Sequence, residues 1–428
     1  MRKTRRLKAG LALICLTVLL SGIALGDPPD LPGVVVLEEP VEDDLLPLLH
    51  FAREAVENAH GADGTGEFVD DTQYYHDIRA VFPEEKNEAS KIVINFLGDC
   101  TLACHETDHG KDNTIEEYVK KYGADYPFYR VQHILEQDDL TVANFEGTLH
   151  NTNDGYYTVP KKTYSFRGDE SMAEVLKAGS VEAVSLANNH IGDYGTPGYE
   201  DTVRVLNEQN IPWFACSEYG SQTFVYEKDG IRIGFISAYI SFFWNNLGVI
   251  QKAMKELRDQ NCSAIIGIMH GGVEYDKRHD DYQLGLARAF IRYGCDLVIG
   301  HHPHCLQGYG VVEGVPVYYS LGNFVFGGNA RLNTTRKGVA KSVKYTMILS
   351  YALSFDENGV FLGSRANLIP CRLSEDENVN YYQPYAVLGA DAAGAIEEVL
   401  YDTKAPYLLN GYEEGVGALQ EFVPARAK

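Results

Sequence analysis

Histidines follow two apolar runs in this sequence, at points where strands are expected to end. His302 and His304 form an HPH segment after one run, and His270 follows another. Because side chains alternate along an extended segment, the two imidazoles of HPH lie on the same side of the backbone, which Pro303 stiffens. Such a pair suits Zn, Mn or Fe better than Ca. We interpret His302 and His304 as metal ligands, and the place of His270 in the series favours the same role.

The segment SLANNHIGDYG carries a second chemical signal after an apolar run. Asn189 offers a neutral oxygen ligand, and His190 can serve as an acid or a ligand. The alternative is structural, with Asn188 and Asn189 as turn residues and His190 as a surface imidazole. The tight, glycine-containing loop favours the functional interpretation.

Two carboxylates also follow apolar runs, Asp99 in NFLGDC and Glu146 in VANFEGTL. Taken alone, Asp99 is better interpreted as a turn-capping residue, and Glu146, which could bridge cations, is a weaker signal still. Asn323 ends a further run, and there a structural role is preferred. Strand-end loops that bring Asp, Asn and His to one rim build metal sites in open α/β sheets. The sequence therefore predicts a metal-dependent hydrolytic centre.

Apolar runs alternate with amphipathic segments from Lys91 onward. Strands are expected at 91–98, 140–145, 181–188, 211–216, 263–270, 295–300 and 315–324, and helices at 114–123, 127–137, 170–180, 199–210, 247–260, 281–294 and 391–403. Residues 223–239 predict a hairpin around a turn at 228–230, and further β-runs flank 356–359. Because hairpins need antiparallel neighbours, this mixture fits two packed sheets flanked by helices better than one doubly wound sheet.

The amino terminus has the features of an export signal. Residues 1–26 combine a basic start, an apolar stretch and a small-residue cleavage site. We favour cleavage of this segment. Because the apolar run 9–26 approaches the length that spans a bilayer, a retained membrane anchor is the alternative. Residues 27–90 are acidic and rich in turn residues, with a helical pattern only at 44–60. We expect a linker or stalk there.

Composition restricts the partners. The 428 residues are 45% hydrophobic, enough for a large core and more than one structural unit. Loss of residues 1–26 would remove five basic residues and no acid, taking the net charge from −23 to −28. An acidic surface of this kind repels polyphosphate chains, which argues against nucleic-acid binding.

Seven cysteines remain after Cys15, without a C-x-x-C pair, so neither a disulfide framework nor a zinc ribbon is indicated. Cys100 and Cys104 are spaced i,i+4 around the Asp99 motif. Export would allow a disulfide between them, but buried free thiols are the favoured interpretation.

Several segments together resemble the CapA family of bacterial capsule or poly-γ-glutamate synthesis proteins, which is related to calcineurin-like metallophosphoesterases. GDCTL, ANFEGTL, SLANNHIGDYG, MHGGVEY, GHHPHCLQG and YYSLGNFVF occur in the family's order, over roughly Lys91–Gly328. The resemblance implies an α/β fold, a four-layer αββα sandwich with mixed sheets, and a two-metal site between the sheets. We expect this domain over 91–375, followed by a C-terminal extension over 376–428.

The resemblance also implies roles for single residues. His190 resembles the acid that protonates the leaving group. The implied metal ligands are Asp99, Glu146, Asn189, His270, His302 and His304, and the implied second-shell or loop residues are Asn188, His301 and Asn323. They would hold one or two divalent ions, Mn, Zn or Fe. The sequence departs from the phosphoesterase pattern at Thr101, where Asp-x-His is usual, and at Glu146, where aspartate is usual. A site with fewer ligands leaves three alternatives: it holds one ion tightly, it holds the second ion only with substrate, or it has lost phosphoesterase activity.

The resemblance implies a protein of capsule or poly-γ-glutamate biosynthesis or export, secreted or on the extracellular face of the membrane. Polyglutamate or another envelope polymer, and membrane-bound synthase or export subunits, are the expected partners. We favour a metal-dependent hydrolase that cleaves a phosphoester or an amide. The competing hypothesis is a non-catalytic, membrane-tethered subunit that binds nascent polyglutamate.

Overall fold

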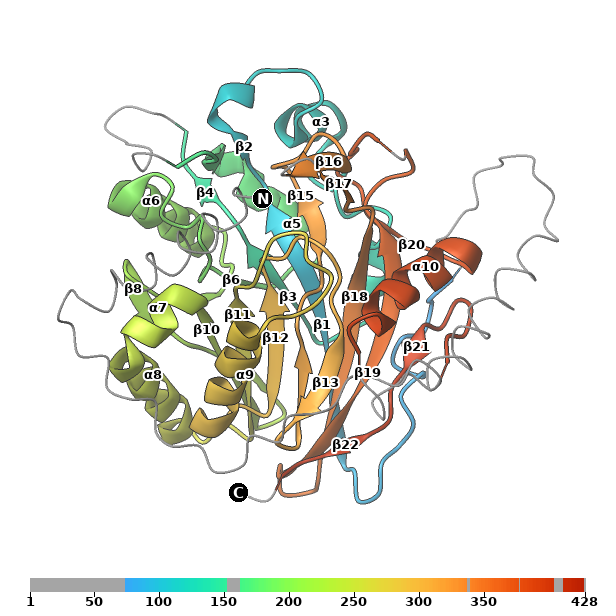
Figure 1. Cartoon of the computed structure of the whole chain (residues 1–428). Coiled ribbons are helices and arrows are strands. Elements are labelled where there is room, and N and C mark those ends of the chain that lie inside the picture. The colour runs from blue at the N-terminus through green and yellow to red at the C-terminus, as the bar shows by residue number, and fades with distance from the viewer. Residues whose placement is uncertain (1–73, 152–161, 337–338, 377, 404–410, 427–428) are drawn as a thin grey trace, which may run out of the picture. The chain divides into compact units, whose positions relative to one another are not determined.

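The structure is a computed structural model, and it describes residues 74–151, 162–336, 339–376, 378–403 and 411–426 (Figure 1). The expected export signal at 1–26 and the expected helix at 44–60 lie outside these residues. No helix of the described part of the chain is both long and apolar enough to cross a membrane.

The first sheet is built around β1 (Ser90–Thr101), drawn in light blue in Figure 1. On one side β3 (Leu140–Phe145) runs parallel to it. On the other side, β18 (Tyr345–Phe355) pairs antiparallel with the first half of β1, and β15 (Asn323–Phe326) pairs parallel with its end. β19 (Phe361–Arg372) continues the sheet beyond β18.

The second sheet consists mostly of parallel strands, in the order β10 (Ile231–Tyr239), β11 (Ala264–His270), β12 (Leu297–His301) and β14 (Val315–Tyr318). Hairpins add β9 (Phe224–Lys228) and β13 (Tyr309–Val312) antiparallel to its edge strands. β7 (Trp213–Ser217) pairs with both β10 and β6 (Ala183–Ser185), so it joins the two sheets. Both sheets are mixed, as expected.

Short strands and helices complete the fold. The remaining strands are β2 (Cys104–His105), β4 (Thr148–Leu149), β5 (Phe166–Gly168), β8 (Gly220–Gln222), β16 (Asn333–Arg336), β17 (Val339–Ser342), β20 (Tyr385–Ala386), β21 (Ala418–Leu419) and β22 (Val423–Pro424). The helices within the described residues are η3 (Glu106–Asp108), α3 (Ile115–Tyr122), α4 (Gln132–Leu135), η4 (Glu170–Met172), α5 (Ala173–Ala178), α6 (Gly195–Glu208), α7 (Ile240–Asn245), α8 (Leu247–Asp259), α9 (Asp281–Tyr293) and α10 (Gly389–Leu400).

Alternation along the strands separates three apolar cores. Ile94 of β1 and Ile266 of β11 belong to one core between the sheets. Val93, the neighbour of Ile94, faces a second core with α5 and α6, and Ile265 faces a third with α8 and α9. Because each sheet therefore buries both faces, the layers follow the order helix, sheet, sheet, helix. This confirms the expected four-layer arrangement.

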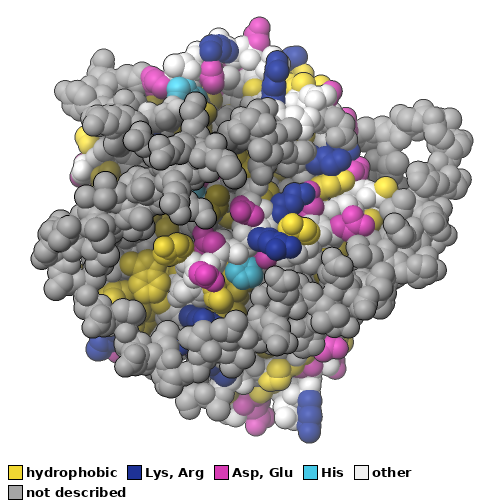
Figure 2. Space-filling model, in the orientation of Figure 1, with side chains coloured by type: hydrophobic (Ala, Val, Ile, Leu, Met, Phe, Trp, Pro, Cys, Tyr) yellow, Lys and Arg dark blue, Asp and Glu magenta, His cyan; other side chains and the backbone are white. Residues whose placement is uncertain are grey.

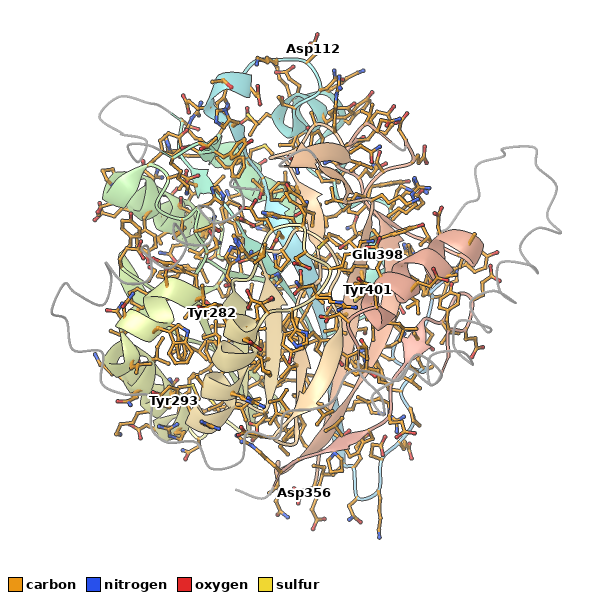
Figure 3. The ribbon with its side chains drawn as sticks, viewed as in Figure 1. Asp112, Tyr282, Tyr293, Asp356, Glu398 and Tyr401 are labelled. Carbon is orange, nitrogen blue, oxygen red and sulfur yellow. The ribbon has the colours of Figure 1, made fainter. Side chains whose placement is uncertain are left out.

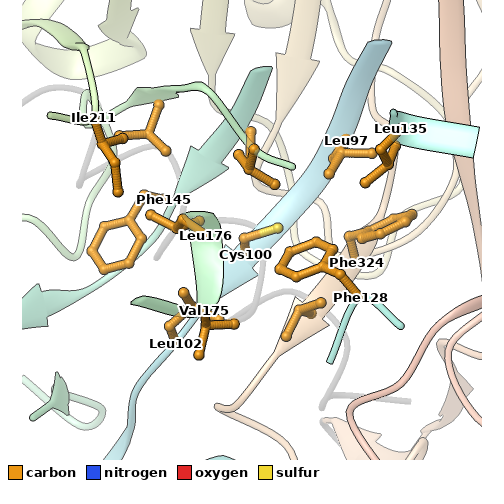
Figure 4. Packing of buried hydrophobic residues seen from close by; sticks show 14 of the residues in the cluster. Leu97, Cys100, Leu102, Phe128, Leu135, Phe145, Val175, Leu176, Ile211 and Phe324 are labelled. Carbon is orange, nitrogen blue, oxygen red and sulfur yellow. The ribbon is translucent and has the colours of Figure 1, made fainter. Parts of the chain in front are cut away.

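Figure 4 shows part of the core between the first sheet and its helices, where Cys100 lies among Phe145, Leu176 and Phe324. Burial in this apolar setting raises the pKa of the Cys100 thiol to about 12. Cys100 and Cys104 are both free thiols, as the favoured interpretation holds.

Two expected elements differ from the structure. The expected strand at 315–324 is divided into two strands in different sheets. Its first part, β14, pairs with β12 of the second sheet, and its last residues begin β15, which pairs with β1 of the first sheet. Gly322, with φ 72°, turns the chain between them. The expected helix at 127–137 shrinks to the single turn of α4, flanked by irregular turns.

Segments on both sides of the family-like region pack onto the same fold. Tyr75, Ile78 and Phe82 are buried in the core with α5, although they precede residue 91. Near the carboxyl end, α10 contributes to the core between the sheets, and β21 pairs antiparallel with β19. The folded unit is thus wider than the resemblance alone covers.

Candidate metal centre

The candidate site lies at the carboxyl ends of parallel strands from both sheets. Asp99 lies two residues before the end of β1, and Glu146 directly follows β3. His270 ends β11 and lies in register with His301 of β12. The Asn189 loop follows β6. Since parallel strands finish at the same edge of their sheet, the two sheets bring these side chains together.

Asp99 is fully buried at the centre of this group. Its Oδ1 lies 2.8 Å from Asn144 Nδ2 and 3.2 Å from His301 Nδ1, and its Oδ2 lies 3.3 Å from His304 Nδ1. Burial by itself would raise the pKa of Asp99, but hydrogen bonds and charge from His301 and His304 outweigh it and hold the pKa well below its usual value. Asp99 is therefore an anion at neutral pH.

Glu146 is fully buried, yet neither of its oxygens has a hydrogen-bond partner within the described part of the chain. Its Oε1 lies 3.7 Å from His190 Nε2 and 3.8 Å from His270 Nε2. Burial, and next the charge of Asp99, raise the pKa of Glu146 to about 8. A buried carboxylate without donors is costly, and a bound cation would offset that cost.

The histidines differ in how readily they can bind a metal. His270 Nε2 lies 2.6 Å from Asn189 Oδ1 and 3.1 Å from His302 Nδ1. Burial, and next the charge of His304, lower the pKa of His302 to about 4. Burial, and next the charge of His302, hold the pKa of His270 well below its usual value. Both rings are thus neutral, which is the form that binds metals.

His304 behaves in the opposite way. Burial lowers its pKa, but the carboxylates of Glu146 and Asp99 outweigh this and raise the pKa to about 9. The two buried carboxylates therefore draw a positive charge to this point. Asn323 Oδ1 lies 2.8 Å from His304 Nδ1, which fits the orienting role expected for Asn323.

Two overlapping sets of donor atoms lie close enough to share an ion. Glu146, His302 and His304 form one set, and Asp99, Glu146 and His270 form the other, with the atoms of each within 4.8 Å of one another. Carboxylate and imidazole donors suit Mn, Zn and Fe. The residues therefore fit a divalent metal, and Glu146, common to both sets, is placed to bridge two ions.

His190 is oriented by a residue that the sequence analysis did not identify. Its Nδ1 lies 2.8 Å from Asp193 Oδ2, and Asp193 also accepts a hydrogen bond from Phe166 N at 2.7 Å and pairs with Lys162. Burial lowers the pKa of His190, although Asp193 acts in the opposite direction. The spacing i,i+3 in NHIGD could have indicated this pair.

Asn144 is a second residue that the sequence analysis missed. Besides Asp99, its Nδ2 approaches His270 Nδ1 at 3.3 Å, and its Oδ1 accepts from Asn188 Nδ2 at 3.4 Å. Asn188 also donates to Phe145 O at 2.6 Å, which fits its expected loop role. The only signal in the sequence is a polar residue within the apolar run LTVANF.

The structure thus gathers every candidate residue at one rim, while their assignment as ligands or acid stays a prediction. Thr101, which replaces the histidine usual in phosphoesterases, is buried, and its hydroxyl has no hydrogen-bond partner among the described residues.

A family model described as "Bacterial capsule synthesis protein PGA_cap" matches residues 93–328. The chain therefore belongs to this family of bacterial capsule synthesis proteins, which confirms the CapA resemblance seen in the sequence.

The chain is also similar in sequence to two curated relatives. The chain is 29% identical over 266 residues to the capsule biosynthesis protein CapA of Bacillus anthracis, covering 58% of this chain and 62% of that protein. It is 28% identical over 265 residues to the PGA biosynthesis protein CapA of Bacillus subtilis (strain 168), covering 58% and 67%. The chain thus spans about two thirds or less of these relatives.

Solved structures with a similar fold include a putative 5'-nucleotidase from Staphylococcus aureus, with 14% identity, a TM-score of 0.39 and coverage of 70% of this chain and 55% of that one. The NAD nucleotidase of Haemophilus influenzae has 13% identity, a TM-score of 0.36 and coverage of 72% and 56%.

Proposed function

We propose that this chain is an exported protein of capsule or poly-γ-glutamate biosynthesis or export. We also propose that the candidate metal centre at the carboxyl ends of the strands, called the rim below, is a metal-dependent hydrolase site. The observation that carries the hydrolase proposal is Glu146, a fully buried carboxyl group that has no hydrogen-bond partner among the described residues and lies 3.8 Å from the neutral imidazole of His270. Family membership supports the role in capsule synthesis, and the pattern of residues 1–26 supports export.

Different residues of the rim would bind the metal and donate the proton during hydrolysis. A divalent ion held by Asp99, Glu146, Asn189 and the histidines would supply an activated water and offset charge on the leaving oxygen. Asp193 accepts from His190 Nδ1, which leaves Nε2 turned toward Glu146 and the ligands. His190 Nε2 is therefore placed to take up a proton, forming an imidazolium that Asp193 stabilises, and to donate that proton to the leaving group.

The substrate that we propose is a phosphoester or a γ-glutamyl amide of an envelope polymer. Acidic polymers carry a high negative charge, and the chain has a net charge of −23. Acidic and basic side chains are interspersed on the face seen in Figure 2. Binding of such a polymer would therefore depend on the local charge of the metal site rather than on the surface as a whole.

Thr101 supports a second candidate function, a non-catalytic subunit that binds nascent polyglutamate. Without the histidine usual at this position, one ligand is missing from the phosphoesterase pattern, and metal binding without turnover is the expected behaviour of such a subunit.

The first experiment measures metal per chain by plasma mass spectrometry in the purified protein and in a His302→Ala/His304→Ala variant. A matched control changes two histidines that lie near each other outside the site, His76→Ala/His133→Ala. We expect the first variant alone to lose bound metal. Equal metal content in all three proteins would overturn the proposed site.

Loaded protein is then assayed on aryl phosphoesters and γ-glutamyl amides. Turnover that disappears in His190→Ala supports the hydrolase. Stoichiometric metal without turnover of either substrate class would favour the binding subunit.

A further inference from the structure

A second cluster of metal-ligating side chains lies apart from the rim, where β2 leads through η3 to α3. Cys104, His109 and Glu116 place their donor atoms within 4.8 Å of one another. In Figure 3, the labelled Asp112 marks this connection, at the end of the fold opposite the turn at Asp356. None of these residues belongs to the candidate site described above.

The three donor atoms form a compact triangle. His109 Nδ1 lies 2.9 Å from Glu116 Oε2 and 3.4 Å from Cys104 Sγ, and the sulfur lies 3.7 Å from Glu116 Oε2. Zinc bonds of 2.0–2.3 Å at tetrahedral angles give donor–donor separations of about 3.3–3.6 Å. The triangle therefore matches three corners of a zinc tetrahedron with shifts of a few tenths of an ångström.

The geometry argues against a catalytic thiol in this cluster. A nucleophilic triad needs the thiol at one nitrogen of the imidazole and the carboxylate at the other. Here both contacts fall on Nδ1 of His109. Burial, and next the charge of Glu116, also raise the pKa of the Cys104 thiol far above its usual value, so the free thiol is not activated.

Two further atoms of the cluster are buried and lack a partner within the described chain, Glu116 Oε1 and His109 Nε2. Sulfur, nitrogen and oxygen also converge on one point, where the three side chains themselves supply only the Cys104 thiol and one imidazole N–H as donors. The side chains of His109 and Glu116 keep 18% and 14% exposure, which leaves a route for an ion and space for solvent as a fourth ligand.

We propose that Cys104, His109 and Glu116 form a second metal site that binds zinc. Thiolate, imidazole and carboxylate are the donors that zinc takes in proteins, and the thiolate selects against Mg and Ca. On binding, the Cys104 thiol loses its proton to solvent and a sulfur–zinc bond forms, with no change of oxidation state.

An ion at this point ties β2 to the first turn of α3 and fixes the η3 turn between them. Glu106 of η3 accepts a hydrogen bond from Tyr194, the neighbour of Asp193. The second site therefore braces a segment that adjoins the residue orienting His190.

The test uses the full-length protein, stripped of metal and loaded with Co²⁺ as the spectroscopic probe. Thiolate bound to Co²⁺ gives a charge-transfer absorption that nitrogen and oxygen ligands do not give. We expect this band in the unmodified protein and in His302→Ala/His304→Ala. We expect its loss in Cys104→Ser, whereas Cys100→Ser, which removes a buried thiol near the rim, keeps it.

Because Cys104 is buried, His109→Ala serves as a second variant at a partly exposed position. It should lose one equivalent of zinc per chain, and zinc should no longer raise its melting temperature as much as it raises that of the unmodified protein. Absence of the band in the loaded unmodified protein, or an unchanged band in folded Cys104→Ser, would overturn the second site. Loss of metal in His302→Ala/His304→Ala concerns the rim alone, so the two proposals fail independently.

Discussion

At the scale of single residues, the rim is a group of charges that balance only in part. Asp99 has two imidazoles as partners, while Glu146 has no hydrogen-bond donor within the described chain. The same burial that makes Glu146 unfavourable in the metal-free protein makes it a strong ligand when a cation is present.

Glu146→Gln should separate these two effects. The amide keeps the shape of the side chain but removes the negative charge, so metal affinity should fall by at least ~10-fold. The metal-free variant should melt at the same temperature as the unmodified protein or higher, because the amide cannot ionise, whereas the carboxyl with its pKa of about 8 loses stability as the pH rises toward that value. Metal titration and thermal unfolding after chelation measure the two effects. Unchanged affinity would remove Glu146 from the ligand set.

Asp138 provides a pH test away from the rim. Burial is the main cause that raises its pKa to about 8, although Thr141 Oγ1 donates to it at 2.7 Å. Because the folded pKa exceeds the unfolded value, the stability contributed by protonated Asp138 is complete below pH ~4 and is lost as pH rises through about 8. Asp138→Asn should therefore gain stability relative to the unmodified protein between pH 5 and pH 8.

Melting temperatures of both proteins at the two pH values check this expectation. Asp259→Asn, at an exposed position that ends α8, is the control. Its melting temperature relative to the unmodified protein should be nearly the same at both pH values. A difference for Asp138→Asn that is the same at both values would contradict the raised pKa.

At the scale of elements, the rim depends on how closely β1 and β15 approach. Gly98 precedes Asp99, and a Cβ at this position would lie 2.2 Å from the carbonyl oxygen of Gly322. The same carbonyl accepts the hydrogen bond of Asp99 N at 2.9 Å. The glycine therefore allows the close backbone contact with Gly322 that fixes the position of Asp99 in the site.

Gly98→Ala should destabilise the fold by ~1–3 kcal/mol or more, because backbone atoms must move apart. Gly248→Ala is the matched control, since its Cβ would meet nothing within 4 Å in α8, and it should be neutral or stabilising by up to ~1 kcal/mol. Denaturant unfolding measures both. An equal effect of the two changes would show that the approach of β1 to β15 is not tight.

At the scale of the whole molecule, the carboxyl-terminal helix completes the core between the sheets. Ile396 of α10 is 6% exposed and belongs to the same core as Ile94 and Ile266. Residues beyond the family-matched region therefore contribute to the stability of the family-matched sheets.

Ile396→Ala should cost ~2–5 kcal/mol of unfolding free energy, since it leaves a cavity in that core. Val360→Ala, at a position 57% exposed, should change the unfolding free energy by less than ~0.5 kcal/mol. Chemical denaturation with metal held constant distinguishes them. A small effect at Ile396 would mean that α10 is a separate appendage rather than part of the core.

The sequence by itself determined the local features of this protein. The apolar run of β1, the amphipathic patterns of α8 and α9, and the hairpin between β9 and β10 follow from neighbouring residues, and the structure confirms them. The candidate residues of the rim were also identifiable, because each stands next to an apolar run that ends there.

Only the tertiary structure decided which of these residues meet and in what charge state. The contact of Asn144 with Asp99, the pair of His190 and Asp193, and the difference between His302 and His304 depend on burial and on partners from separate strands. The break between β14 and β15 likewise arises because one apolar run serves two sheets. Periodicity reports which face of a strand is buried, but it carries no information about the distant groups that share the buried space.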